Sequence, residues 1–110
     1  MRDITTRDLK ESLILLLLKT KDDGEGGWQE VWQEGPRLWA ALWPLMDPQK
    51  MTPAYRLVLR APLIFPRTIR FLWPLQRSIK RLVVTKDPVL IQYNRFYAMI
   101  AEEEEHAQTS

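Results

Sequence analysis

Residues 13–33, LILLLLKTKDDGEGGWQEVWQ, are the stretch that decides the fold. They begin with a continuous apolar run, Leu13 to Leu18, which has the length of a strand covered on both faces. Asp22 and Asp23 then tolerate turn geometry, and the glycines that follow can supply the positive φ values of a tight turn. The stretch therefore predicts a glycine-rich β-hairpin. Its expected turn glycines are Gly24, Gly26 and Gly27.

The part of the hairpin after the glycines is rich in tryptophan. Its residues alternate with the strand period of two, Trp28, Glu30 and Trp32 on one face and Gln29, Val31 and Gln33 on the other. Aromatic side chains suit the pleated surface of a sheet. We therefore expect this part to be the strand that returns from the turn.

The next segment, RLWAALWPLM at residues 37–46, fits two patterns. Four of its apolar residues have the i, i+3, i+4, i+7 spacing of a helical stripe, whereas the part between Pro36 and Pro44 has the length of a strand. A segment this short is marginal as a helix, so a strand is preferred. The residues of the helical stripe are Trp39, Leu42, Trp43 and Met46.

Further short strands are expected at residues 55–61, 67–73, 79–85 and 89–101. Prolines separate the earlier ones, and Asp87–Pro88 is expected to form a turn because proline fixes φ and biases the preceding residue away from the helical region. Many short strands with frequent turns predict a mainly β fold. The expected architecture is a small antiparallel β-barrel or sandwich of about six short strands, with a helical turn near either end.

The length of 110 residues indicates a single domain. We expect an N-terminal arm at residues 1–8 and an acidic C-terminal tail at residues 102–110. The longest apolar run is too short to span a bilayer and lacks a small-residue cleavage site. Neither a membrane anchor nor a signal peptide is therefore expected.

The sequence lacks the motifs of catalysis and of cofactor binding. It has no cysteine, which excludes disulfides, thiolate metal sites and thiol nucleophiles. Neither the glycine-rich dinucleotide motif nor the phosphate-loop lysine motif occurs, and one histidine cannot form a relay. His106 beside glutamates supplies too few placed ligands for a metal. The chain is therefore predicted not to be an enzyme and to bind neither a cofactor nor a metal.

The order of the segments resembles the head–tail joining family of tailed phages, also called head-closure or stopper proteins. In that family an acidic hairpin ends in Gly-Gly-x-x-Glu-x-Trp, similar to Gly26, Gly27, Glu30 and Trp32. A block of the type Trp-Ala-x-x-x-Pro-Leu is similar to Trp39, Ala40, Pro44 and Leu45. A short Asp-Pro turn and a final strand with an acidic end are similar to Asp87, Pro88 and Glu102 to Glu105. The resemblance covers residues 9–105 and also favours the strand at 37–46.

This resemblance implies a structural protein of a phage virion or of a gene transfer agent particle, assembled in the bacterial cytoplasm. Family members sit as a ring beneath the portal and its adaptor, retain packaged DNA and present the surface on which the tail docks. The implied partners are other copies of the chain, a portal or adaptor protein above, a tail terminator or tail protein below and, non-specifically, packaged DNA. No membrane partner is implied. The chain departs from many members in its short connection at residues 46–54, where they have a longer loop that can project into the channel.

A ring subunit contacts its own copies and the rings above and below, so it carries more apolar surface than its core requires. The five tryptophans either serve such contacts, since tryptophan is a frequent interface anchor, or all fill one core. The candidate interface residues are Trp28, Trp32, Trp39, Trp43, Arg56, Arg60, Arg70, Arg77, Lys80, Arg81, Arg95, Glu102 and Glu103.

Charge is unevenly distributed, although the net charge is only +2. Residues 56–86 are basic, and their charged side chains either form a solvated surface or contact an acidic neighbouring ring or DNA phosphates. The acidic run Glu102 to Glu105 is either a solvated tail or a complement to that basic stretch on an adjoining subunit. For Arg95 the candidate partners are acidic residues of its own chain or of the next subunit.

The alternative function is a small β-barrel module that binds nucleic acid through aromatic rings in a basic groove. The tryptophans, however, cluster in the least basic third of the chain, which favours the connector. A peripheral membrane protein would need an amphipathic helix that the sequence does not show. A connector is expected to bind oligonucleotides weakly, without sequence preference, and with an affinity that falls steeply as salt increases.

Overall fold

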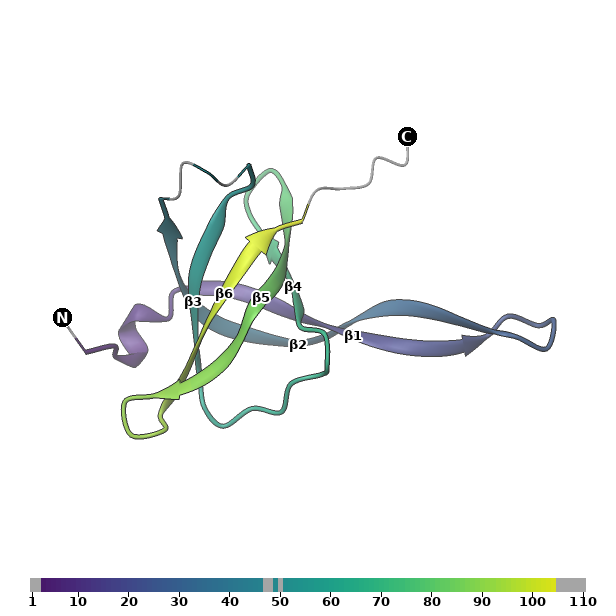
Figure 1. Ribbon diagram of the computed structural model, residues 1–110, viewed down its shortest axis with the longest axis horizontal. Helices are drawn as coiled ribbons and strands as arrows, with labels where there is room; N and C mark the ends of the chain where they lie inside the picture. Colours follow the sequence, from purple (N-terminus) through teal and green to yellow (C-terminus); the bar gives the residue numbers. More distant parts are fainter. Residues whose placement is uncertain (1–2, 47–48, 50, 105–110) are drawn as a thin grey trace.

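The computed structural model describes residues 3–46, 49 and 51–104 as a closed β-barrel preceded by a short 3₁₀ turn, η1 (Thr6–Asp8) (Figure 1). Neighbouring strands are antiparallel throughout the order β1-β2-β3-β6-β5-β4, which closes on itself. The predicted mainly β fold is confirmed, and of the two expected architectures, barrel or sandwich, the structure has the barrel. No helix among the described residues has the length and apolar character needed to cross a membrane. The strands are β1 (Glu11–Asp22), β2 (Trp28–Leu45), β3 (Ala54–Arg60), β4 (Arg70–Pro74), β5 (Ile79–Ile91) and β6 (Phe96–Glu103).

The barrel interior is filled by alternate residues of all the strands, as expected where side chains point to opposite faces in turn. Phe71 of β4 and Leu82 of β5 are fully buried there. Burial of this apolar surface is the main force that holds the barrel together. The other buried members of the interior cluster are Leu13, Leu15, Ala40, Tyr55, Leu57, Leu59, Ile69, Met99 and Ala101.

A second buried cluster lies outside the barrel wall, beneath the N-terminal segment. Ile4 packs there with Val58 of β3 and Phe96 of β6. The Gln92 side chain fixes the segment, because its Oε1 accepts from the Ile4 N–H at 2.6 Å and its Nε2 donates to the Ile4 carbonyl at 2.7 Å. The N-terminal segment is thus part of the folded structure from Ile4 onward.

The β1–β2 hairpin continues well beyond the barrel (Figure 1). Strand β4 pairs with β1 only at Ile14–Leu16, and β3 pairs with β2 only from Ala40 onward. Residues 17–33, called the hairpin arm below, therefore form a two-stranded ribbon of their own. The arm makes the molecule elongated, with principal extents of 55 × 32 × 27 Å.

The turn at the tip of the arm uses two of the three glycines in the expected way. Gly24 and Gly26 have φ values of +81° and +83°, a region that glycine enters without a steric cost. The expectation of a positive φ at Gly27 is wrong. There the N–H instead donates to Asp23 Oδ1 at 3.0 Å, and an added Cβ would lie 2.7 Å from Asp23 Oδ2.

Strand β2 runs without a break through the segment that fitted both helix and strand. The preferred strand is confirmed as far as Leu45. It does not start after Pro36, however, because β2 already begins at Trp28. Gly35 and Pro36 lie where the pairing with β1 shifts register, between Ile14 and Leu16. Proline fits such a bulge because it has no N–H to give to the ladder.

The predicted turn at Asp87–Pro88 is wrong, because both residues lie inside β5. They coincide with a register shift between Lys86 and Val89, where an unpaired proline is tolerated. The chain turns later, at residues 92–95, so the expected single strand 89–101 is two strands joined by a hairpin turn. This turn places Gln92, Tyr93 and Asn94 at φ values of 48°, 57° and 64°.

Candidate functional site

The tryptophans lie in separate environments, so the interpretation that all five fill one core is wrong. Trp73 packs against the interior cluster, and Trp43 packs against the outer cluster with the Arg56 guanidinium 5.8 Å from its ring. Trp28 and Trp39 are 74% and 62% exposed. Exposed tryptophans of this kind are candidates for contact with another molecule.

Trp32, the remaining tryptophan, is held at the base of the arm by Arg70 of β4. The Arg70 guanidinium lies 4.7 Å from the centre of the Trp32 ring, within the range of a cation–π contact. The same guanidinium forms an ion pair of 3.0 Å with Glu104, just after β6. Arg70 therefore ties the base of the arm to the barrel.

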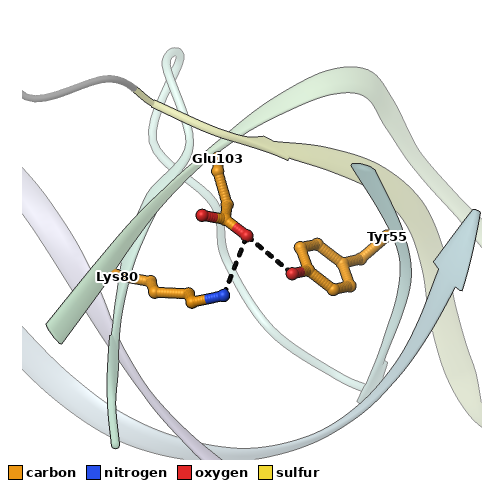
Figure 2. A network of polar contacts seen from close by, with 3 residues as sticks. All are labelled: Tyr55, Lys80 and Glu103. Atoms are coloured by element: carbon orange, nitrogen blue, oxygen red, sulfur yellow. Dashed lines mark hydrogen bonds and ion pairs between the residues drawn. The ribbon is translucent and has the colours of Figure 1, made fainter. Parts of the chain in front are cut away.

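A polar network closes one end of the barrel (Figure 2). The Tyr55 hydroxyl donates to Glu103 Oε2 at 2.7 Å, and the Lys80 ammonium donates to the same oxygen at 3.0 Å. Beside them, the Trp73 ring meets Tyr55 edge-on at 5.3 Å, and its Nε1 donates to Glu11 at 3.1 Å. Strands β1, β3, β4, β5 and β6 each contribute one side chain, so the network fastens the barrel end together.

The protonation equilibria of this network follow from its contacts. Burial, together with the hydrogen bond to the Glu103 carboxylate, raises the pKa of Tyr55 because both disfavour the phenolate. The hydrogen bond to Glu103 raises the pKa of Lys80 because it favours the ammonium form. At neutral pH the uncharged Tyr55 hydroxyl and the Lys80 cation both donate to Glu103, and this contact stabilises the fold.

Stability is expected to fall in the alkaline range, from about pH 10 upward, where the unfolded tyrosine begins to lose its proton. Both pKa values are raised on folding, so their contribution is complete below the unfolded pKa values of 10.0 and 10.5 and is lost as the pH rises through the folded ones. Urea unfolding across this range measures the loss. Tyr55→Phe is expected to show a shallower loss, whereas the exposed Tyr93→Phe is expected to match the wild type. Equal slopes for all three proteins would contradict the assigned network.

The candidate basic residues divide between the surface and ion pairs within the chain. Arg70 and Lys80 pair with Glu104 and Glu103, so part of the acidic run complements the basic stretch of its own chain. Glu102 lies next to Thr52, whose hydroxyl donates to it at 3.3 Å. Residues 105–110 lie outside the described ranges. The exposed candidates are Arg60, Arg77, Arg81 and Arg95.

A groove that the sequence did not indicate lies beside Trp39. It has a volume of about 450 Å³ and is lined by residues 37–39 of β2, residues 59–60 of β3, Leu63, and Thr6 and Leu9 of the N-terminal segment. Two exposed arginines, Arg37 and Arg60, flank its apolar lining. We call it the arginine groove. Sequence patterns could not find it because its lining comes from segments far apart in the chain.

The fold and these surfaces define a closed antiparallel barrel with a projecting arm and an arginine-flanked groove. No protein-family model and no curated protein matches the chain. Among solved structures, it is similar to a chain of the virion of a native gene transfer agent particle, with a TM-score of 0.55 and 22% identity. The similarity covers 90% of this chain and 97% of the other. At this identity the likeness shows a shared fold.

Proposed function

We propose that the chain is a structural protein of a phage-like particle, and that within the particle it is a head–tail connector of the stopper or head-closure type. The observation that carries the proposal is the likeness to a gene transfer agent virion chain over nearly the whole length of both proteins. The ordered resemblance of the hairpin, the Trp-Ala block and the acidic end to head–tail joining proteins supports the same assignment.

In this role the protein forms a ring with its own copies, below the portal or adaptor, retains packaged DNA and provides the surface on which the tail docks. A ring subunit needs a rigid body and separate contact surfaces. The closed barrel supplies the body, because within the barrel wall each strand is paired on both sides. The arm, with its exposed Trp28, and the arginine groove, with its exposed Trp39, supply surfaces that the barrel itself does not use.

A second candidate function, a nucleic-acid-binding module, is favoured by one observation. The lining of the arginine groove combines the exposed Trp39 with two arginines, a combination that can stack a base and hold phosphates. The two functions differ in binding strength. A connector is expected to bind oligonucleotides weakly and to lose them as salt approaches the physiological range, whereas a dedicated module retains tight binding there.

Removing this chain from the particle tests the connector assignment. Electron microscopy of particles assembled without it is expected to show DNA-filled heads that carry no tails, or heads that have lost their DNA. Supplying the chain in trans should restore tailed particles, which controls for effects on neighbouring genes. Normal tailed, DNA-filled particles without the chain would overturn the proposal.

A further inference from the structure

We propose that the hairpin arm of one copy docks into the arginine groove of the next copy, with Trp28 as its anchor. The inference rests on the proposed function, because it assumes that copies assemble in a ring, and it names the two surfaces that meet. Four features of the structure support it: the two unlike faces of the arm, its charge, the chemistry of the groove and the positions of both in the molecule.

The two faces of the arm differ in chemistry. The cross-strand pairs Leu18–Trp32, Thr20–Glu30 and Asp22–Trp28 place these residues on one side of the ribbon, called the tryptophan face. The opposite side holds Lys19 and Lys21, paired with Val31 and Gln29. The tryptophan face therefore combines apolar and acidic side chains and carries no lysine.

This face is open to another molecule where it passes beyond the barrel. Arg70 covers Trp32 at the base of the arm, but Leu18 is 40% exposed and Trp28, beside the tip, is 74% exposed. A lone two-stranded ribbon is at best marginally stable in water. Contact with a second surface would stabilise the arm and bury its apolar residues.

The tip of the arm is negatively charged and shaped by its own backbone. Asp22 accepts the Gly24 N–H at 2.9 Å, and Asp23 accepts the Glu25 N–H at 2.7 Å. The backbone N–H groups of Glu25 and Gly27 lower the pKa of Asp23, so its carboxylate stays ionised. With Glu25, the tip presents three carboxylates next to Trp28.

The arginine groove is complementary to this tip in both charge and polarity. Arg37 and Arg60 offer exposed guanidinium groups, which bind carboxylates with matched geometry. The partly buried Leu9, Leu38 and Leu63 line the same space of about 450 Å³, together with Trp39. An indole side chain can enter such a space while carboxylates at its edge meet the arginines.

Tip and groove lie where one copy can engage the next. The groove is lined in part by Thr6 of η1, and η1 lies at the opposite end of the long axis from the tip of the arm (Figure 1). The six arm residues of β1 extend about 20 Å at the usual rise of a strand. The contact is therefore head-to-tail, and repeated head-to-tail contacts generate a ring when the rotation between copies closes.

Disulfide trapping tests the contact, because the natural chain contains no cysteine. A full-length Glu30→Cys protein, which keeps Trp28 and places its thiol on the tryptophan face, is mixed with a full-length Leu63→Cys protein under mild oxidation, in solution and in assembling particles. A mixed disulfide is expected, and its yield should exceed by about tenfold that of a Gln29→Cys and Leu63→Cys mixture, since a shift of one residue moves the thiol to the opposite face. Equal yields from the two mixtures would overturn the proposal.

Charge reversal in the groove gives a second test. The two trapping cysteines are kept, and Arg37→Glu and Arg60→Glu are added to the copy that carries Leu63→Cys. This double change is expected to lower the yield of mixed disulfide about tenfold. The control, Arg67→Glu with Lys86→Glu, changes the net charge equally at exposed residues outside the groove and should leave the yield unchanged. Equal losses in both variants would overturn the proposal, as would an oligonucleotide that binds the groove tightly at physiological salt.

These outcomes separate the inference from the function on which it rests. If particles without the chain lose their tails but the cysteine pair does not cross-link inside particles, the contact is wrong and the connector assignment stands. If the pair cross-links in solution while particles without the chain assemble normally, the contact stands and the connector assignment is wrong.

Discussion

Phe71→Ala is expected to lower the free energy of unfolding by about 3–5 kcal/mol, a large part of the stability of a domain this size. Phe71 has no exposed surface and belongs to the interior cluster, together with side chains from the other strands. A closed barrel cannot collapse around the missing ring without changing its strand register, so the substitution leaves a cavity.

Urea unfolding of the variant measures this loss. The matched control is Tyr93→Ala, which removes an aromatic side chain that is 97% exposed and is expected to change stability by no more than about 0.5 kcal/mol. Similar losses in both variants would contradict the assigned interior.

Gly35→Ala is expected to destabilise the protein by about 1–3 kcal/mol, although it adds a single methyl group. A Cβ at Gly35 would lie 2.8 Å from the Leu15 carbonyl oxygen and 2.9 Å from Leu17 Cγ, closer than such atoms approach. The carbonyl belongs to β1, so it can move only if the β1–β2 pairing is distorted at the bulge.

The exposed Gln33→Ala, on the same strand, serves as the control for Gly35→Ala. It is expected to leave the melting temperature and the amide exchange of the arm unchanged. Faster exchange through the arm in Gly35→Ala alone would confirm that the bulge positions it. Wild-type stability in Gly35→Ala would show that the strands are not so close there.

The barrel could be predicted from the sequence because its strands carry local signals. Alternation after Trp28, the apolar run at residues 13–18 and the glycines at the tip each act over a few residues, and each agrees with the final fold. The strand through residues 37–45 was harder to predict, because its apolar residues have helical spacing although the length between prolines favours a strand. Its pairing with β3 favours the strand over the helix, and that pairing cannot be inferred from the local sequence.

The β5–β6 connection shows where local signals fail. Asp87–Pro88 has the composition of a turn, but a register shift absorbs the proline inside β5. The real turn uses Gln92, Tyr93 and Asn94 in the left-handed region, which non-glycine residues enter at a cost of about 1–2 kcal/mol each. Gln92 is held there by Ile4, which is 88 residues away in the sequence.

The candidate surfaces were predictable only in part. Composition pointed to tryptophans and arginines, and Trp28 and Trp39 are indeed exposed. It could not show that Arg70 and Lys80 are already engaged by carboxylates of their own chain, because that depends on which strands become neighbours. The arginine groove could not be predicted for the same reason, since Arg37 and Leu63 line one space only once the barrel has formed.

The central claim, that this barrel is a head–tail connector subunit, is tested most directly by cryo-electron microscopy of the intact particle that contains the chain. The map is expected to show a ring of closed barrels between the portal or adaptor and the first tail ring, with each projecting arm in contact with a neighbouring copy. Density for this barrel in the capsid shell or at the distal end of the tail, with another protein filling the head–tail junction, would contradict the account.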